Sequence, residues 1–334
     1  MRSVRPLPDG IQPSSRRGFL REGATGILLI LVAGVAVMTA FGFAGTLWWV
    51  FDLLSHPRLQ YAGVAGLAAL GLAILGRRGL AVGAVVLALV NAAVVAPFFV
   101  FGQAPAGTGG SAMTVVSFNV QIRNPDREAV IEWVGNLDAD VVFLWEASQI
   151  WRDEVLAADL PFRIQDPLQA GMTIGGLGLT RDQADVRLLE TGDRSSIEVK
   201  LPFGNEAVTI IGAHPFPPNS AMHTASRDFQ LSSVAELAAG IEGPLIVTGD
   251  LNTTPWSAGF RPLNEELVNS MNGFGWQPTY PAGAGLLMLP IDHLLHSGHL
   301  TTVDRSTGPD LRSDHLPLIV TVADSAEVAA GAGG

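Results

Sequence analysis

A carboxylate and an amide stand two residues apart at the end of an apolar run in the C-terminal half of the chain, Pro244-Leu245-Ile246-Val247-Thr248-Gly249-Asp250-Leu251-Asn252. A short β-branched run predicts a strand that is buried on both faces. Asp250 and Asn252 would then leave the end of that strand, where a rigid scaffold can hold polar groups in a cleft. Gly-Asp-x-Asn also forms ordinary turns, because Asp and Asn side chains bond to their own backbone. The run by itself is compatible with both interpretations.

Other predicted strands carry polar groups of catalytic types at or near their ends. Apolar strands are predicted at 113–117, 141–145, 207–213, 290–295 and 316–322, and a helix is predicted at 260–270. The polar groups of these strands are Asn119, Glu146, His214, Asp292, and Asp314 with His315. Because polar groups at the strand ends of layered sheets commonly build sites, we expect this set to join Asp250 and Asn252 in one site.

The order of these groups resembles the endonuclease/exonuclease/phosphatase family, which is also described as DNase I-like. The motifs that carry the resemblance are Ser117-Phe118-Asn119-Val120, Trp145-Glu146, His214, Gly249-Asp250-Leu251-Asn252, Ile291-Asp292-His293 and Ser313-Asp314-His315. They cover about residues 113–323. The resemblance implies an α/β (α+β) fold, a four-layer α/β/β/α sandwich of two packed mixed sheets.

That family includes pancreatic-type deoxyribonucleases, abasic-site endonucleases, neutral sphingomyelinases and inositol polyphosphate phosphatases. The runs His214-Pro215-Phe216-Pro217-Pro218 and Asp250-Leu251-Asn252-Thr253-Thr254-Pro255-Trp256-Ser257, behind an apolar N-terminal part, are similar to a bacterial membrane-anchored branch. This branch includes teicoplanin- and vancomycin-resistance proteins. The resemblance implies hydrolysis of a phosphoric ester or pyrophosphate, assisted by a divalent metal.

The resemblance places the principal metal ligand at Glu146, with Asn119 and Asp314 supporting the metal directly or through water. A hard cation held by carboxylates neutralises the charge that builds on the phosphoryl oxygens. Cysteine is absent and the histidines are needed elsewhere in the site, so the ligand set is rich in oxygen. Such a set favours Mg²⁺ or Mn²⁺ over Zn²⁺.

The resemblance places Asp250 and Asn252 on the opposite side of the phosphate. Asp250 would orient or deprotonate the attacking water, and Asn252 would donate to a phosphoryl oxygen. His315 would act as base or as a donor in the transition state, with Asp292 fixing its tautomer. Whether Asp250 or His315 takes the proton stays open at this stage.

Two further side chains are candidates for contact with the phosphate. His214 would donate to the phosphoryl group. Arg194 is a candidate phosphate clamp, because a guanidinium matches phosphate geometry.

Charge is distributed unevenly along the 334 residues, whose net charge is −11. Residues 1–110 hold eight Arg and three acidic residues, whereas residues 111–334 hold twelve Lys/Arg and twenty-eight acidic residues, a net charge of −16. An acidic domain repels polyphosphate backbones, so nucleic acid is the less favoured partner. The absence of cysteine excludes disulfides, thiolate metal sites and cysteine nucleophiles.

Three apolar stretches near the N-terminus, 26–51, 60–76 and 79–101, predict three transmembrane helices, because about 20 apolar residues cross a bilayer core as a helix. Arginines in the N-terminal tail and at 77–78 place these segments in the cytoplasm. Three crossings then put the C-terminal domain outside. Residues 15–21 also resemble a twin-arginine export signal, the alternative being that these arginines anchor the first helix.

The predicted organisation is a cytoplasmic Arg-rich tail at 1–22, three transmembrane helices at 23–102, a linker at 103–112, an endonuclease/exonuclease/phosphatase domain at 113–324 and a disordered tail at 325–334. A flexible linker of this length reaches on the order of 20 Å, which keeps the site near lipid headgroups.

The predicted function is therefore a metal-dependent phosphohydrolase, anchored in a bacterial cytoplasmic membrane, whose extracytoplasmic site acts on a lipid-linked phosphate or pyrophosphate. One alternative is an anchored extracellular nuclease or phosphodiesterase, which the charge of −16 disfavours. A catalytically inactive membrane scaffold is the third interpretation, which the complete set of polar groups disfavours. The sequence predicts no protein partner.

Overall fold

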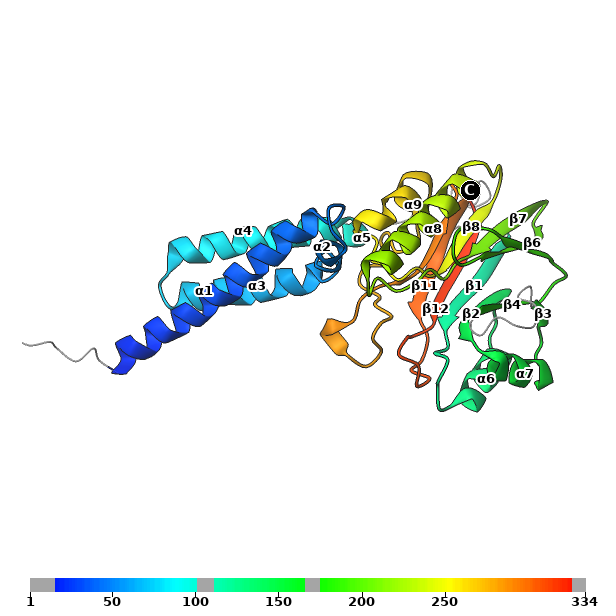
Figure 1. The fold of residues 1–334 in the computed structure, drawn as a ribbon, viewed down its shortest axis with the longest axis horizontal. Helices are drawn as coiled ribbons and strands as arrows, with labels where there is room; N and C mark the ends of the chain where they lie inside the picture. The colour runs from blue at the N-terminus through cyan, green and yellow to red at the C-terminus, as the bar shows by residue number, and fades with distance from the viewer. Residues whose placement is uncertain (1–15, 101–110, 166–174, 326–334) are drawn as a thin grey trace, which may run out of the picture.

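The computed structural model describes residues 16–100, 111–165 and 175–325, which form a helical module followed by a layered domain (Figure 1). The helices of the module are α1 (Arg16–Phe43), the short α2 (Trp49–Leu53), α3 (Arg58–Ile74), α4 (Arg78–Val95) and the short α5 (Pro97–Val100). α1, α3 and α4 run side by side as an elongated bundle, and the layered domain lies at one end of it.

Sheet A contains the first and the last strands of the layered domain. Its strands are β1 (Ala112–Asn119), β2 (Val141–Ala147), β3 (Arg163–Gln165), β4 (Gly175–Thr180), β11 (Leu300–Thr307) and β12 (Leu318–Asp324), in the order β11-β12-β1-β2-β4-β3. β1 is parallel to β2 and antiparallel to β12, so the sheet is mixed.

Sheet B is built from the middle of the domain. Its strands are β5 (Asp185–Leu189), β6 (Ser196–Phe203), β7 (Glu206–Gly212), β8 (Leu245–Asp250), β9 (Val268–Asn269) and β10 (Asp292–His296), in the order β5-β6-β7-β8-β10-β9. β7 is parallel to β8, whereas β8 is antiparallel to β10.

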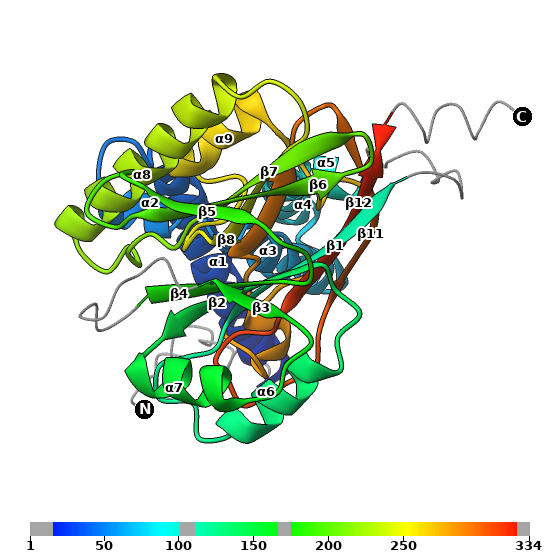
Figure 2. The same ribbon diagram turned by 90° about the vertical axis from the view of Figure 1, so that its right-hand side faces the viewer.

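Helices cover the outer face of each sheet, which gives four layers (Figure 2). On sheet A these are α6 (Arg127–Gly135) and α7 (Gln149–Ala157), and on sheet B they are α8 (Ala221–Ala239) and α9 (Arg261–Glu266). Two short 3-10 helices, η1 (Ala258–Phe260) and η2 (Gly285–Leu287), lie in loops. The structure confirms the α/β/β/α sandwich of two mixed sheets that the sequence predicts.

Alternation along the central strands explains the layers. In β1, Val115 belongs to the core between the two sheets, whereas Val116 packs under α6 and α7. In β8, Ile246 joins the core between the sheets, whereas Val247 packs under α8 and α9. Successive side chains of a strand point to opposite faces, so a strand that is covered on both faces reads as a continuous apolar run.

The helical module differs in detail from the prediction. α1 begins at Arg16, so the helix includes part of the segment predicted as a polar tail. α1 and α4 are long and apolar enough to cross a membrane, whereas α3 has 17 residues and is shorter. Two helices, not three, therefore meet this criterion. The predicted linker lies mostly outside the described residues, as does the predicted tail after Ser325.

The segment 52–57, which we call the docking loop, joins the module to the layered domain. Asp52 Oδ2 pairs with Arg227 of α8 at 2.8 Å, and both side chains are buried. His56 Nδ1 lies 2.9 Å from Thr254 Oγ1, and Trp256 Nε1 donates to the carbonyl of Ser55 at 3.0 Å. A buried charge that loses its partner is costly, so this contact fixes the loop on the domain.

Candidate active site

Strand register brings the predicted groups together at one edge of the sandwich. In the parallel pair β1–β2, Asn119 lies beside Trp145, and Glu146 is the next residue. In the antiparallel pair β8–β10, Asp292 lies directly opposite Asp250. The pairing of each sheet thus sets two polar groups next to each other before any side-chain contact forms.

The amide of Asn119 connects the two sheets. Its Nδ2 donates to Glu146 Oε1 at 3.2 Å in sheet A and to Asp250 Oδ2 at 3.0 Å in sheet B. Glu146 also accepts the backbone N–H of Ile122 at 3.2 Å. The hydroxyl of Ser313 donates to the carbonyl of Asn119 at 2.7 Å. Two carboxylates from different sheets are therefore held on either side of one amide.

Asp250 lies between this amide and two imidazoles. Its Oδ2 is 3.5 Å from His214 Nε2 and 3.6 Å from His315 Nε2, and its Oδ1 accepts the backbone N–H of Asn252 at 3.0 Å. The carboxylate is buried, and burial raises the pKa of Asp250, although the two imidazoles and Asn119 oppose that effect. Asp250 is thus the point where groups from both sheets meet.

His315 is paired with Asp292 on its other nitrogen. Nδ1 of His315 lies 2.8 Å from Asp292 Oδ2, and both side chains are buried. Burial alone would lower the pKa of His315, but the Asp292 and Asp250 carboxylates outweigh it and raise this pKa to about 10. Burial lowers the pKa of His214 to about 4, with Asp250 opposing. The two imidazoles therefore differ, because the neighbouring carboxylates favour the charged form of His315 whereas burial favours the neutral form of His214.

The backbone of the site is strained at two of its polar residues. Glu146 and Asn252 have φ values of 58° and 52°, in the left-handed region that non-glycine residues rarely occupy. Gly249 has a φ of 151°, and a Cβ there would lie 1.8 Å from the carbonyl oxygen of Ala213. Strain of this kind persists where the surroundings over-determine it, often at functional sites.

Arg194 also lies at the site. Its Nη1 donates to the carbonyl of His214 at 3.2 Å, and its guanidinium stacks over the Phe216 ring at 4.0 Å. Burial lowers the pKa of Arg194, and the carboxylates of Glu146 and Asp250 oppose this. The guanidinium therefore lies within electrostatic reach of both carboxylates.

Asn252 and Asp314 also make contacts within the protein that their predicted roles did not include. Asn252 Nδ2 donates to the carbonyl of Pro215 at 3.1 Å, which uses one of its two amide hydrogens. Asp314 is half-buried, and its backbone carbonyl accepts from Ala282 N at 2.8 Å. Its carboxylate helps to raise the pKa of His315. The roles predicted for these two residues remain predictions.

Some residues of the site were not predicted from the sequence. The ring of Tyr280 lies 4.8 Å from the ring of His315, and Ser313 bonds to the backbone of both Asn119 and His315. Tyr280 is one of only two tyrosines, which is the single signal that the sequence offers for it. Arg227 donates to the carbonyl of Asn252 at 3.4 Å and so connects the docking loop to the site.

The side chains at this edge fit a divalent cation. Asp250, Asp292 and His315 each offer a ligand atom, and these atoms lie within 4.8 Å of one another. Asp292 Oδ1 is buried and has no hydrogen-bond partner among the described residues, so it is an acceptor that a cation or a water would satisfy. Carboxylate and amide oxygens are ligands that hard cations prefer.

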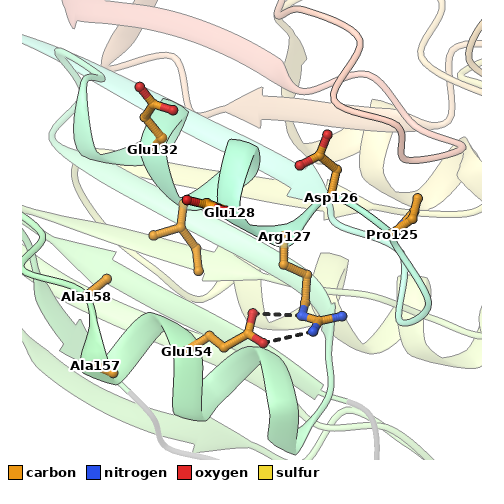
Figure 3. Close-up of a pocket in the computed structure, with 9 residues that line it drawn as sticks. Pro125, Asp126, Arg127, Glu128, Glu132, Glu154, Ala157 and Ala158 are labelled. Atoms are coloured by element: carbon orange, nitrogen blue, oxygen red, sulfur yellow. Dashed lines mark hydrogen bonds and ion pairs between the residues drawn. The ribbon is translucent and has the colours of Figure 1, made fainter.

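A separate groove of about 720 Å³ lies between α6 and α7 and contains none of the predicted site residues (Figure 3). Arg127 pairs with Glu154 there through two contacts of 2.7 and 2.8 Å. Its other charged lining residues are acidic: Asp126, Glu128 and Glu132. These carboxylates would repel a phosphate, so this groove is not the site of phosphate chemistry.

Comparison with known proteins agrees with this geometry. Residues 116–315 match the model of the Endonuclease/Exonuclease/phosphatase family. A functionally unknown conserved protein from Enterococcus faecalis V583 aligns with a TM-score of 0.55 at 16% identity, covering 64% of this chain and 100% of that chain. D. rerio TDP2, complexed with a single strand DNA product, aligns with a TM-score of 0.53 at 15% identity, covering 63% and 98%. The search of curated proteins found no match.

A two-sheet sandwich whose strand ends gather carboxylates, imidazoles and an amide defines a hydrolase that acts on phosphoester bonds. The chain belongs to the endonuclease/exonuclease/phosphatase family, since the family model matches more than half of it. Members of this family depend on a divalent metal, and the carboxylates gathered at this edge of the sandwich agree with that requirement.

Proposed function

We propose that this protein is a membrane-anchored, metal-dependent phosphohydrolase that cleaves a lipid-linked phosphate or pyrophosphate. The observation that carries the proposal is the position of Asp250, which lies between the Asn119 amide at the end of β1 and two imidazoles, His214 after β7 and His315 before β12. A phosphate next to this carboxylate would be contacted by groups from both sheets. Hydrolysis needs such two-sided contact, because water attacks on one side of the phosphorus and the leaving group departs on the other.

Glu146, Asn119 and Asp314 are the residues that we propose to hold the cation. The donors are oxygen atoms, which favours Mg²⁺ or Mn²⁺. When bound, the cation would neutralise the charge that develops on the phosphoryl oxygens. The half-buried carboxylate of Glu146 already accepts two N–H groups, so its orientation is fixed in advance.

Asp250 and His315 are the pair that we propose to handle the proton of the attacking water. Their Oδ2 and Nε2 atoms lie 3.6 Å apart, and the bond to Asp292 turns Nε2 of His315 towards Asp250. The water oxygen bonds to phosphorus as the bond to the leaving oxygen breaks; the pair accepts the water's proton, and the leaving oxygen departs with the electron pair of its bond and takes a proton from solvent. Asp292 acts by holding His315, as a carboxylate does for a catalytic imidazole.

Arg194, His214 and Asn252 are the proposed donors to the phosphoryl oxygens. Arg194 is held in place by the Phe216 ring and by the carbonyl of His214. The second amide hydrogen of Asn252 is left for substrate, since the first bonds to Pro215. Donors that are fixed before the reaction stabilise developing charge without reorganisation.

The surface of the helical bundle supports anchoring in a membrane. Large apolar side chains point outward along it, with exposed fractions of 74% for Ile30, 73% for Leu67 and 62% for Leu89. An apolar surface of this extent is unfavourable in water. At the end of the bundle opposite the layered domain, Arg77 pairs with Glu22 and Arg21 donates to the carbonyl of Leu75.

Basic residues favour the cytoplasmic side of a membrane, which orients the bundle. The arginine-bearing end would then be cytoplasmic, and the layered domain would be extracytoplasmic on a bacterial cytoplasmic membrane. A reporter fused after residue 110 tests this orientation, since a cytoplasmic signal would contradict it.

An anchored nuclease or phosphodiesterase is the second candidate. The structural similarity to D. rerio TDP2 with its single strand DNA product favours it. The net charge of −16 after residue 110 opposes it, because nucleic acid binding relies on cationic groups that neutralise phosphates. A catalytically inactive membrane scaffold is the third candidate.

The test uses the full-length chain in phosphatidylcholine nanodiscs with prenyl pyrophosphate, phospholipid, single-stranded DNA and plasmid as substrates. Each is incubated with Mg²⁺, with Mn²⁺ or with EDTA, and phosphate release and DNA cleavage are measured. We expect divalent-dependent release of phosphate from the lipid-linked substrate. DNA cleavage without lipid hydrolysis would support the nuclease, and no cleavage of any substrate would support the scaffold.

A further inference from the structure

A cavity of about 330 Å³ lies beside the candidate site, between the docking loop and the layered domain. Its apolar walls include Leu53 from the helical module and Pro218, Leu289 and Ile291 from the domain. Its volume is within the range of small-molecule pockets, roughly 300–1,000 Å³. The walls therefore come from two parts of the chain that are far apart in the sequence.

The cavity shares two lining residues with the candidate site. Asn252 and Tyr280 line the cavity, and both also belong to the surroundings of the site. The backbone N–H of Asn252 bonds to Asp250, and the Tyr280 ring packs against the His315 ring at 4.8 Å. The atoms that follow a phosphate held at Asp250 and His315 would thus meet apolar walls.

The outer wall of the cavity is fixed by buried polar contacts. The ion pair of Asp52 with Arg227 excludes water almost completely, with exposed side-chain fractions of 3% and 0%. Next to it, the ring of His56 bonds to Thr254 and the indole of Trp256 bonds to the docking loop. The cavity is therefore formed before a ligand arrives, which lowers the cost of binding.

The rim of the cavity continues towards the helical module as an exposed apolar loop. Leu286 and Leu287 in η2 have exposed fractions of 86% and 70%. The carbonyls of Leu286 and Met288 accept from Nε2 of Gln60, in the first turn of α3, at 2.9 and 3.1 Å. This rim thus lies next to the end of the bundle that faces the domain (Figure 1), where the proposed membrane surface would be.

We propose that this cavity takes the hydrocarbon chain of the substrate, in the segment next to the phosphate. The proposal rests on the proposed function, and it adds that the organic group next to the phosphate is a hydrocarbon chain. Three observations carry it: apolar walls, lining residues shared with the candidate site, and an apolar rim next to the bundle. A polar sugar or nucleoside in this place would lie against Leu53, Leu289 and Ile291, whose side chains offer its hydroxyl and amide groups no partners.

The test measures how hydrolysis by the full-length chain in nanodiscs depends on chain length. The substrates are butyl, octyl, dodecyl and farnesyl diphosphate, the last of which separates isoprenoid from straight chains. Each methylene that enters the cavity contributes about 0.8 kcal/mol, which is about fourfold in affinity. We expect kcat/KM to rise from butyl towards dodecyl diphosphate and then to level off when the cavity is filled.

Substitutions that fill the cavity should remove this dependence. Leu53→Trp and Leu289→Trp act from opposite walls, and each is expected to lower the ratio of dodecyl to butyl kcat/KM at least tenfold. Leu188→Trp is the matched control, because Leu188 lies on β5 outside the cavity and is 37% exposed. This control should keep the wild-type ratio.

The outcomes separate this inference from the proposed function. Equal kcat/KM for all chain lengths in the wild type would overturn the inference and leave a phosphohydrolase. A ratio that stays high in both filled variants would also overturn it. No hydrolysis of any diphosphate would overturn the proposed function, and the inference with it. The wild-type series decides the question even if a filled variant does not fold.

Discussion

The two halves of the candidate site differ in how firmly their side chains are held. In sheet A, Glu146 is only half-buried and its carboxylate accepts from one amide and one backbone N–H. On the other side of the site, Asp250 and Asp292 of sheet B are buried, and the buried His315, from the loop before β12, lies between the two carboxylates. An open half suits the exchange of a cation and its waters, whereas a closed half suits fixed proton positions.

The closed half is also supported from outside the layered domain. Arg227 contacts the carbonyl of Asn252 on one side and pairs with Asp52 of the docking loop on the other. No such contact joins the helical module to Asn119 or Glu146 among the residues that the structure describes. The module therefore supports the half of the site that we propose to handle the proton, and the following changes test this in order of decreasing effect on kcat.

Asp250→Asn should have the largest effect, because Asp250 joins both halves. We expect kcat for phosphate release to fall by roughly 10³-fold or more, the scale of losing general base and charge stabilisation together. The control is Asp304→Asn, an exposed carboxylate on β11. Activity near the wild-type level in Asp250→Asn, measured with folded protein, would refute the assignment of the site.

Asp292→Asn should have a smaller effect, because Asp292 acts by holding His315. We expect kcat to fall by about 10- to 100-fold, the scale of losing a partner that orients a catalytic imidazole. KM should change little, since Asp292 is not placed to contact the substrate. A change confined to KM would show that Asp292 binds the phosphate instead.

Asp52→Asn should reduce stability more than catalysis. The change leaves the buried guanidinium of Arg227 with Asp228 as its remaining carboxylate partner. We therefore expect a loss of about 3 kcal/mol in the free energy of unfolding. The thermal unfolding temperature measures it, and kcat of the folded fraction should fall only a few-fold. The double change Asp52→Leu with Arg227→Leu removes both charges and should recover much of the stability. An unfolding temperature of Asp52→Asn equal to that of the wild type would contradict the supporting role.

The smallest effect on kcat at pH 7 is expected for His56→Gln, whose consequence lies in acid stability. Burial lowers the pKa of His56 to about 4, with Asp52 opposing and Arg227 and Arg58 adding to the effect. The unfolded chain therefore binds this proton more readily than the folded chain between about pH 6.5 and 4. Stability from this group is present above pH 6.5 and is lost as the pH falls towards 4.

Thermal unfolding at pH 7.5 and pH 5 checks this expectation. The unfolding temperature of the wild type should fall more between these pH values than that of His56→Gln. Parallel falls in the two proteins would show that the docking loop does not contribute to acid sensitivity.

The sequence predicts the strand-end residues because each lies at or near the end of an apolar run that is typical of a covered strand. It does not predict that Asp292 lies opposite Asp250, because antiparallel pairing between distant segments leaves no local trace. The helix predicted at 260–270 is wrong beyond Glu266, since Val268 and Asn269 pair with β10 as the short strand β9. Tertiary pairing outweighs local propensity there.

The contribution of the helical module to the site also required the structure. Asp52 and His56 read as parts of a loop between two apolar helices, and their partners Arg227 and Thr254 are more than 170 residues away. The sequence does not predict Tyr280 for a related reason, because its loop meets His315 only in the folded chain. Residues whose partners lie in distant segments leave no recognisable spacing pattern in the sequence.

The division of the site into a cation-holding half and a proton-handling half is tested most directly by a Mg²⁺ titration of phosphate release. The wild type is compared with Glu146→Gln and Asp292→Asn. We predict that Glu146→Gln raises the half-saturating Mg²⁺ concentration tenfold or more, whereas Asp292→Asn lowers the maximal rate without moving that concentration. An equal shift of the half-saturating concentration in both variants would contradict the account, because it would place the cation at Asp292 as much as at Glu146.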